Sequence, residues 1–105
     1  MLTSKQRAAL RKAANGLSPV FQIGKEGVEQ SLITATQSCL AKRELIKLRT
    51  LETSPETARE AANALAEATG AEVVQVIGGT MVLYLQKKKE SAYADLLKAA
   101  GKTAR

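Results

Sequence analysis

The sequence predicts an α/β fold in which helices pack on a four-stranded mixed sheet. Three observations support this: three stretches show apolar residues at helical spacing, short runs rich in β-branched residues stand between them, and a Gly-Gly pair separates the last two runs. The resulting order is α-β-α-β-α-β-β. A strand–helix–strand unit followed by a closing hairpin implies a mixed sheet covered by helices.

The first element is an amphipathic helix that stops at Asn15-Gly16. Thr3 or Ser4 caps its start, and Thr3 and Gln6 have the spacing of a capping box. At about 100° per residue, one face holds the apolar residues Leu2, Ala9, Leu10 and Ala13. The opposite arc is expected to hold four cations: Lys5, Arg7, Arg11 and Lys12.

A short strand and a second helix follow. Residues 19–23 predict a strand that a proline begins, and residues 28–42 carry apolar residues at helical spacing. Cys39 lies on the apolar stripe of this helix. Because the chain has no histidine to activate a thiol, we expect Cys39 to be a small buried hydrophobe rather than a nucleophile.

The next pair of elements is a strand over residues 44–51 and the clearest helix of the chain. The strand alternates imperfectly and places three residues on one side: Leu45, Lys47 and Arg49. In the helix we expect Ser54 as the cap, Pro55 in the first helical position and Gly70 at the end.

A tight antiparallel hairpin is predicted from residues 73–77 and 81–85 around Gly78-Gly79. A lysine run, Lys87–Lys89, follows, and a short further helix is expected with Tyr93, Leu96 and Leu97 facing inward. We therefore expect one domain over residues 1–86 and a basic, partly helical C-terminal extension over residues 87–105.

The net charge of +6 and the pI of about 9.7 indicate what kind of partner the protein binds, but they do not indicate its fold. They favour a polyanion: RNA, DNA or an anionic membrane surface. No apolar run approaches the roughly 20 residues of a membrane span, and we expect no membrane association. One cysteine and no histidine make no disulfide or metal cluster and suit a reducing, cytoplasmic compartment.

Little in the sequence favours an enzyme. Acid–base catalysis near neutral pH usually uses histidine, and the ten acidic residues are scattered along the chain. We therefore expect no catalytic residues, no cofactor and no small-molecule substrate.

The most informative motif is the loop Gly24-Lys25-Glu26-Gly27 before the second helix. Glycine backbone can approach an anion closely, and the first amides of a helix carry partial positive charge. Lys25 adds a mobile cation, so the loop suits a phosphodiester backbone. A plain turn is the alternative, since many turns contain two glycines.

Other cations support a polyanion partner but have ordinary explanations as well. Lys42 and Arg43 complement a helix dipole, Lys47 and Arg49 suit a solvated strand face, and the lysine run suits a soluble tail. Sparse aromatics disfavour base stacking, so backbone contacts should dominate. If about four phosphates of single-stranded RNA were neutralised, log affinity would fall against log salt with a slope of roughly −3.

Three segments together resemble a known family: LTSKQRAALRKAANGLSPVFQIGKEGV, ELIKLR and GAEVVQVIGGTMVLY. They are similar to the CRM-type RNA-binding domain in its small bacterial single-domain form, the YhbY-like proteins, and the match runs from Leu2 to Tyr84. The resemblance implies a fold like the C-terminal domain of translation initiation factor 3. It also implies a KH-like loop at Gly24–Gly27.

Bacterial members of that family are associated with precursors of the large ribosomal subunit, so the resemblance implies pre-ribosomal RNA or a pre-50S particle as partner. The family often has histidine where Asn15 stands and arginine where Leu85 stands, and Glu26 adds a negative charge to the loop. The expected RNA contacts are Gly24, Lys25, Glu26, Gly27, Lys5, Arg7, Arg11, Lys12, Lys47 and Arg49.

The resulting hypothesis is a monomeric, non-enzymatic RNA-binding protein of ribosome assembly. The alternative is a protein-interaction module that docks an acidic partner on its basic face. An RNA-processing enzyme would need an acid–base constellation that the sequence does not offer.

Overall fold

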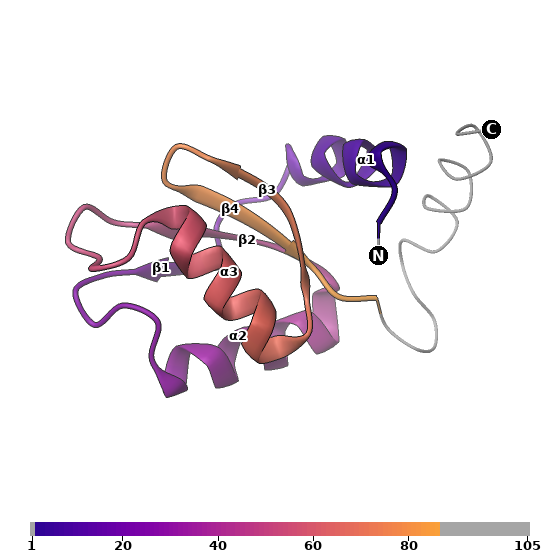
Figure 1. The fold of residues 1–105 in the computed structure, drawn as a ribbon. Coiled ribbons are helices and arrows are strands. Elements are labelled where there is room, and N and C mark those ends of the chain that lie inside the picture. The colour runs from indigo at the N-terminus through magenta and orange to yellow at the C-terminus, as the bar shows by residue number, and fades with distance from the viewer. Residues whose placement is uncertain (1, 87–105) are drawn as a thin grey trace.

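The computed structural model describes residues 2–86 and shows the predicted order of elements in that range (Figure 1). The helices are α1 (Ser4–Ala14), α2 (Gln30–Arg43) and α3 (Ala58–Thr69). The strands are β1 (Phe21–Ile23), β2 (Leu45–Thr50), β3 (Glu72–Ile77) and β4 (Thr80–Tyr84). The α/β class is thereby confirmed, while the expected tail helix and the Lys87–Lys89 run lie outside the described residues.

The sheet is four-stranded and mixed, with strand order β1-β2-β4-β3. β1 runs parallel to β2, and β4 runs antiparallel to both β2 and β3. β1 is a short edge strand that pairs only with the second half of β2, from Phe21 opposite Leu48 to Ile23 opposite Thr50. In the part of the chain that the structure describes, the first half of β2 therefore has no strand on its β1 side.

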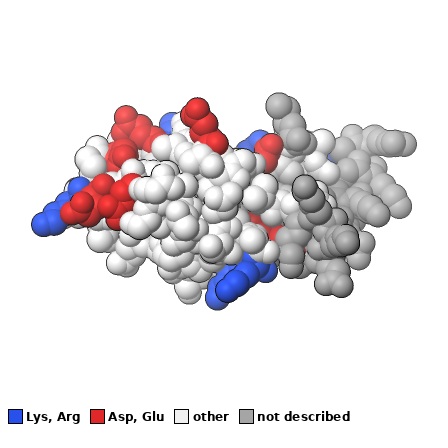
Figure 2. Space-filling view, turned by 90° about the horizontal axis from the view of Figure 1, so that it is seen from below, with Lys and Arg blue, Asp and Glu red and all other residues white. Residues whose placement is uncertain are grey.

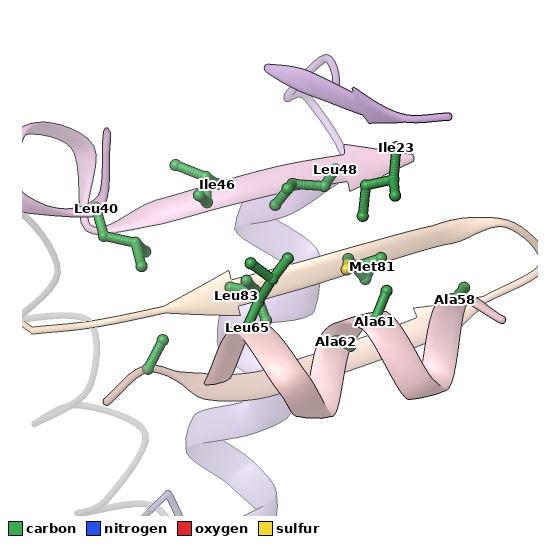
Figure 3. Packing of buried hydrophobic residues seen from close by; sticks show 11 residues of the cluster. Ile23, Leu40, Ile46, Leu48, Ala58, Ala61, Ala62, Leu65, Met81 and Leu83 are labelled. Carbon is green, nitrogen blue, oxygen red and sulfur yellow. The ribbon is translucent and has the colours of Figure 1, made fainter. Parts of the chain in front are cut away.

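The two faces of the sheet are covered unequally. On one face, α2 and α3 pack over the larger apolar cluster, in which Leu65 of α3 lies against β4 (Figure 3). Alanines at Ala58, Ala61 and Ala62 let α3 approach the strands closely. On the other face, α1 is the one helix of residues 2–86 that packs over a smaller cluster, which includes Leu10, Leu45, Val74, Val82 and Tyr84. The helices of this range cover that face only in part, and Ile77 is 64% exposed.

Side-chain caps fix the starts of α1 and α3. The amide of Gln6 donates to the hydroxyl of Thr3 at 3.0 Å, and the amide of Thr3 donates back to the Gln6 side chain at 3.0 Å, so the predicted capping box is confirmed. Without that box, α1 would lose about 1 kcal/mol.

The predicted start of α3 was wrong. Thr57, not Ser54, is the cap, because Thr57 and Glu60 form a capping box and the helix begins only at Ala58. The Ser54 hydroxyl instead bonds the backbone of Glu56 at 2.9 Å and holds a turn before the helix. The predicted end is confirmed, since Gly70 closes α3 in the left-handed conformation, with φ 82°.

Candidate nucleic-acid interface

The Gly24–Gly27 loop connects β1 to α2 and forms a tight turn. The amide of Gly27 donates to the carbonyl of Gly24 at 2.9 Å. Lys25 and Glu26 at the tip are exposed, whereas Gly27 is buried. The loop borders a shallow hollow of about 340 Å³ that continues to the first turn of α2. The backbone is thus held in one shape while its tip projects to solvent.

The end of this loop is fixed by a carboxylate from the segment before α3, that of Glu56. Both oxygens of Glu56 lie 3.3 Å from the amide of Val28, the residue after Gly27. Gly27 has φ 66°, and a Cβ there would overlap the Glu56 carboxylate and Pro55. Gly27 is therefore required by packing and by backbone conformation, whatever the loop binds.

The amides at the start of α2 are less available to an anion than the sequence suggested. The helix begins at Gln30 rather than Val28, and Val28 already donates to Glu56. The N-cap residue Glu29 makes no side-chain cap and accepts a hydrogen bond from the Ser31 hydroxyl at 2.8 Å. Acidic groups therefore surround the helix start, and the exposed tip of the loop is the part left for a ligand.

Three of the four predicted cations of α1 are exposed: Lys5, Arg11 and Lys12. Arg7 is not on that arc. Its half-buried guanidinium donates to the carbonyl of Val73 on β3 and lies 3.9 Å from the carboxylate of Glu72. Arg7 thus ties α1 to the sheet, because its position on the helix faces β3 rather than solvent.

Lys47 and Arg49 lie on the face of the sheet that α1 only partly covers. They alternate with the buried residues Ile46 and Leu48, and they share their side of β2 with Leu45, as predicted. Arg49 is exposed and pairs in register with Gln22 of β1, two residues before the loop. Lys47 is half-buried. These two cations therefore extend from the base of the loop toward α1.

Charge is distributed unevenly over the molecule. Figure 2, which looks onto the α2 side, shows mostly uncharged surface, with acidic and basic groups side by side at the end that holds the loop. Apart from Lys42 and Arg43, the exposed residues of α2 are all uncharged: Gln30, Ser31, Thr34, Gln37, Ser38 and Ala41. Residues 2–86 contain ten lysines and arginines against eight glutamates. Most of the net charge of +6 therefore comes from residues 87–105.

Sequence inspection missed the position of Arg43. It ends α2 and lines a hollow together with Lys47 and residues 17–20. The only signal in the sequence was its basic character, which the helix dipole also explains.

Within residues 2–86, no three histidine, cysteine, aspartate or glutamate side chains are grouped closely enough to hold a metal ion. Over the same residues, every helix is too short or too polar to cross a membrane. Cys39 is half-buried and packs against the larger cluster, as a small hydrophobe would.

Comparison with known proteins gives consistent matches. The family model for the CRS1 / YhbY (CRM) domain matches residues 2–84. "Probable RNA-binding protein YqeI" of Bacillus subtilis is 42% identical over 89 residues, which cover 85% of this chain and 93% of that protein. An "RNA-binding protein" of Haemophilus influenzae is 34% identical over 83 residues, covering 79% of this chain and 84% of the relative.

A solved structure agrees with the fold. The solution structure of the hypothetical protein SAV1595 from Staphylococcus aureus has 42% sequence identity and a TM-score of 0.74. The match covers 87% of this chain and 95% of that one. Because the family model spans nearly all of the described residues and the relatives match over most of their length, the chain belongs to the CRS1 / YhbY (CRM) domain family.

Proposed function

We propose that this protein binds RNA through the ribose-phosphate backbone, with the exposed tip of the Gly24–Gly27 loop as its central contact. Relatives of 42% and 34% identity carry names that describe RNA-binding proteins. The observation that carries the proposal is the geometry of the loop: a fixed turn presents Lys25 to solvent and has Arg49 beside its base. No covalent chemistry is needed for this role.

The extended surface comprises Lys47, Arg49 and the exposed cations of α1, which lie on one side of the sheet. Gly24 allows backbone to approach the phosphates, and Gly27 shapes the turn. Arg7 contributes through the position of α1 rather than by touching RNA. Contacts of this kind recognise backbone and shape rather than base sequence.

The biological target we propose is RNA of the large ribosomal subunit before its assembly is complete. The likeness to small bacterial YhbY-like proteins supports this finer role, and the site of action that goes with it in our proposal is the cytoplasm. A non-catalytic assembly role also suits a chain without histidine.

The test replaces Lys25 and Glu26 by aspartates, which lowers the net charge by two at the loop tip. A matched control, Asn63→Glu with Ala64→Glu, makes the same charge change on the exposed side of α3. Fluorescence anisotropy with a large-subunit ribosomal RNA fragment at low salt should show about a tenfold weaker affinity for the loop variant than for the control.

Two results would contradict the proposal. If the loop variant keeps both the affinity and the salt slope of the control, the loop is not the contact. If partners recovered from cells persist after ribonuclease treatment and no RNA binds the pure protein, the basic face serves an acidic protein instead.

A further inference from the structure

A second hollow lies at the other end of β1 from the loop. Its volume is about 530 Å³, and it is lined by residues 17–20, by Arg43 at the end of α2 and by residues 45–47 of β2. β1 begins only opposite Leu48, and within residues 2–86 the start of β2 has no neighbouring strand on that side. The chain before β1 meets it through the amide of Val20, which donates to the carbonyl of Lys47 at 2.8 Å. We call this hollow the Arg43 groove.

The Arg43 groove combines apolar side chains with positively charged ones. Its apolar lining consists of Leu17, Pro19, Val20, Leu45 and Ile46. Among the residues of the 2–86 range that line it, the two charged ones are both cations, the exposed Arg43 and the half-buried Lys47, and none is acidic. A ligand with a flat apolar part next to a negative charge would satisfy both features. A nucleotide has this composition, and the volume falls in the range of roughly 300–1,000 Å³ typical of ligand sites.

The groove and the loop are close enough to serve one strand of RNA. Val20, which lines the groove, is four positions before Gly24, which begins the loop. At about 3.3 Å per residue, extended chain spans roughly 13 Å between them. The side chain between them that lies on the open face of the sheet, Gln22, is exposed and uncharged. A few nucleotides of single strand can therefore contact both ends of β1.

We infer that the Arg43 groove binds a nucleobase and its adjacent phosphate from the same RNA strand that the loop contacts, so that the protein selects single-stranded RNA. This inference rests on the proposed function. The guanidinium of Arg43 offers a plane on which a base stacks, and Lys47 offers a charge to the phosphate. Leu17, Pro19 and Val20, which are half-buried or exposed, offer aliphatic surface in place of an aromatic platform. A base within a duplex cannot enter without unpairing.

The experiment compares Arg43→Ala with Lys42→Ala. Both side chains are exposed cations in the last turn of α2, so both variants lose one charge and the same favourable interaction with the helix dipole. Only Arg43 lines the groove. Binding is measured by fluorescence anisotropy with three probes: a single-stranded uridine octamer, an abasic ribose-phosphate octamer and a short duplex RNA.

For the uridine octamer, Arg43→Ala should weaken binding about five- to tenfold, and Lys42→Ala about twofold or less. The abasic octamer should bind the natural protein about as weakly as the uridine octamer binds Arg43→Ala. Duplex affinity should change equally in both variants. A second variant, Lys47→Met, keeps the apolar stem and should reduce the salt slope by about one.

Equal effects of Arg43→Ala and Lys42→Ala on binding of the uridine octamer would overturn the groove assignment. The proposed function would still stand if the variant with aspartates at Lys25 and Glu26 lost affinity for RNA. Failure of every RNA probe to bind the natural protein would overturn both. Binding of a polyglutamate peptide that depends on Arg43, without such dependence for RNA, would assign the groove to an acidic protein partner.

Discussion

Gly24 and Gly27 look equivalent in the sequence and differ completely in the structure. Gly27 is buried at φ 66°, and a Cβ would collide with Pro55 and with the Glu56 carboxylate. Gly24 has no positive φ, and a Cβ there would meet Thr53 at 3.7 Å and Leu51 at 3.9 Å, which are ordinary contacts. The first glycine is therefore replaceable in the fold, and the second is not.

The two glycines therefore serve different requirements of the loop: one keeps the loop folded against the domain, and the other leaves room for a ligand. The Gly27 end is fixed to the rest of the domain through Glu56 and Val28. The Gly24 end and the exposed tip carry no comparable restraint from packing. Substitutions at the two ends should therefore affect different properties, namely stability at one end and ligand affinity at the other.

The largest effect is expected for Gly27→Ala. The left-handed backbone and the overlap with Pro55 and Glu56 together should lower the free energy of unfolding by about 2–4 kcal/mol. Urea denaturation followed by circular dichroism measures this change. A loss below that of Gly24→Ala would show that the loop adapts freely and that Gly27 is not fixed by its surroundings.

An intermediate effect is expected for Glu56→Gln. The amide oxygen keeps one hydrogen bond to Val28, but the charge-assisted component is lost, so stability should fall by about 0.5–1 kcal/mol. Removing a negative charge behind the loop should also raise RNA affinity slightly at low salt. Denaturation and anisotropy on one protein sample measure both changes. Unchanged stability would mean that Glu56 does not hold the loop.

The smallest effect on stability is expected for Gly24→Ala. Alanine fits the observed backbone and restricts the unfolded chain, so the free energy of unfolding should change by less than about 0.5 kcal/mol. RNA affinity should nevertheless fall about threefold, because the methyl group limits the approach of a phosphate to the backbone. Thermal unfolding serves as the control that the fold is intact. Full affinity would remove Gly24 from the interface.

Local sequence signals were sufficient for most of the fold. The Thr3–Gln6 capping box, the end of α3 at Gly70 and the Gly78-Gly79 hairpin all depend on residues close in the chain, and each was predicted. The start of α3 was misplaced because two local signals competed. The Thr57–Glu60 box prevailed over Pro55 as the first helical residue.

The site was less predictable because its decisive contacts join distant segments. Arg7 meets a carbonyl 66 residues away, so the helix periodicity of α1 alone could not reveal its partner. Glu56 meets Val28 across 28 residues. The Arg43 groove depends on how far β1 extends along β2, which residues 19–23 did not indicate.

Contact between RNA backbone and the tip of the Gly24–Gly27 loop can be observed residue by residue, by recording amide chemical shifts of the isotope-labelled protein while a single-stranded uridine octamer is added. We expect the largest shifts at residues 24–27, further shifts at residues 43–49 and little change on the exposed side of α3. Large shifts confined to α3 or to the outer face of α2, with residues 24–27 unchanged at saturation, would contradict this contact.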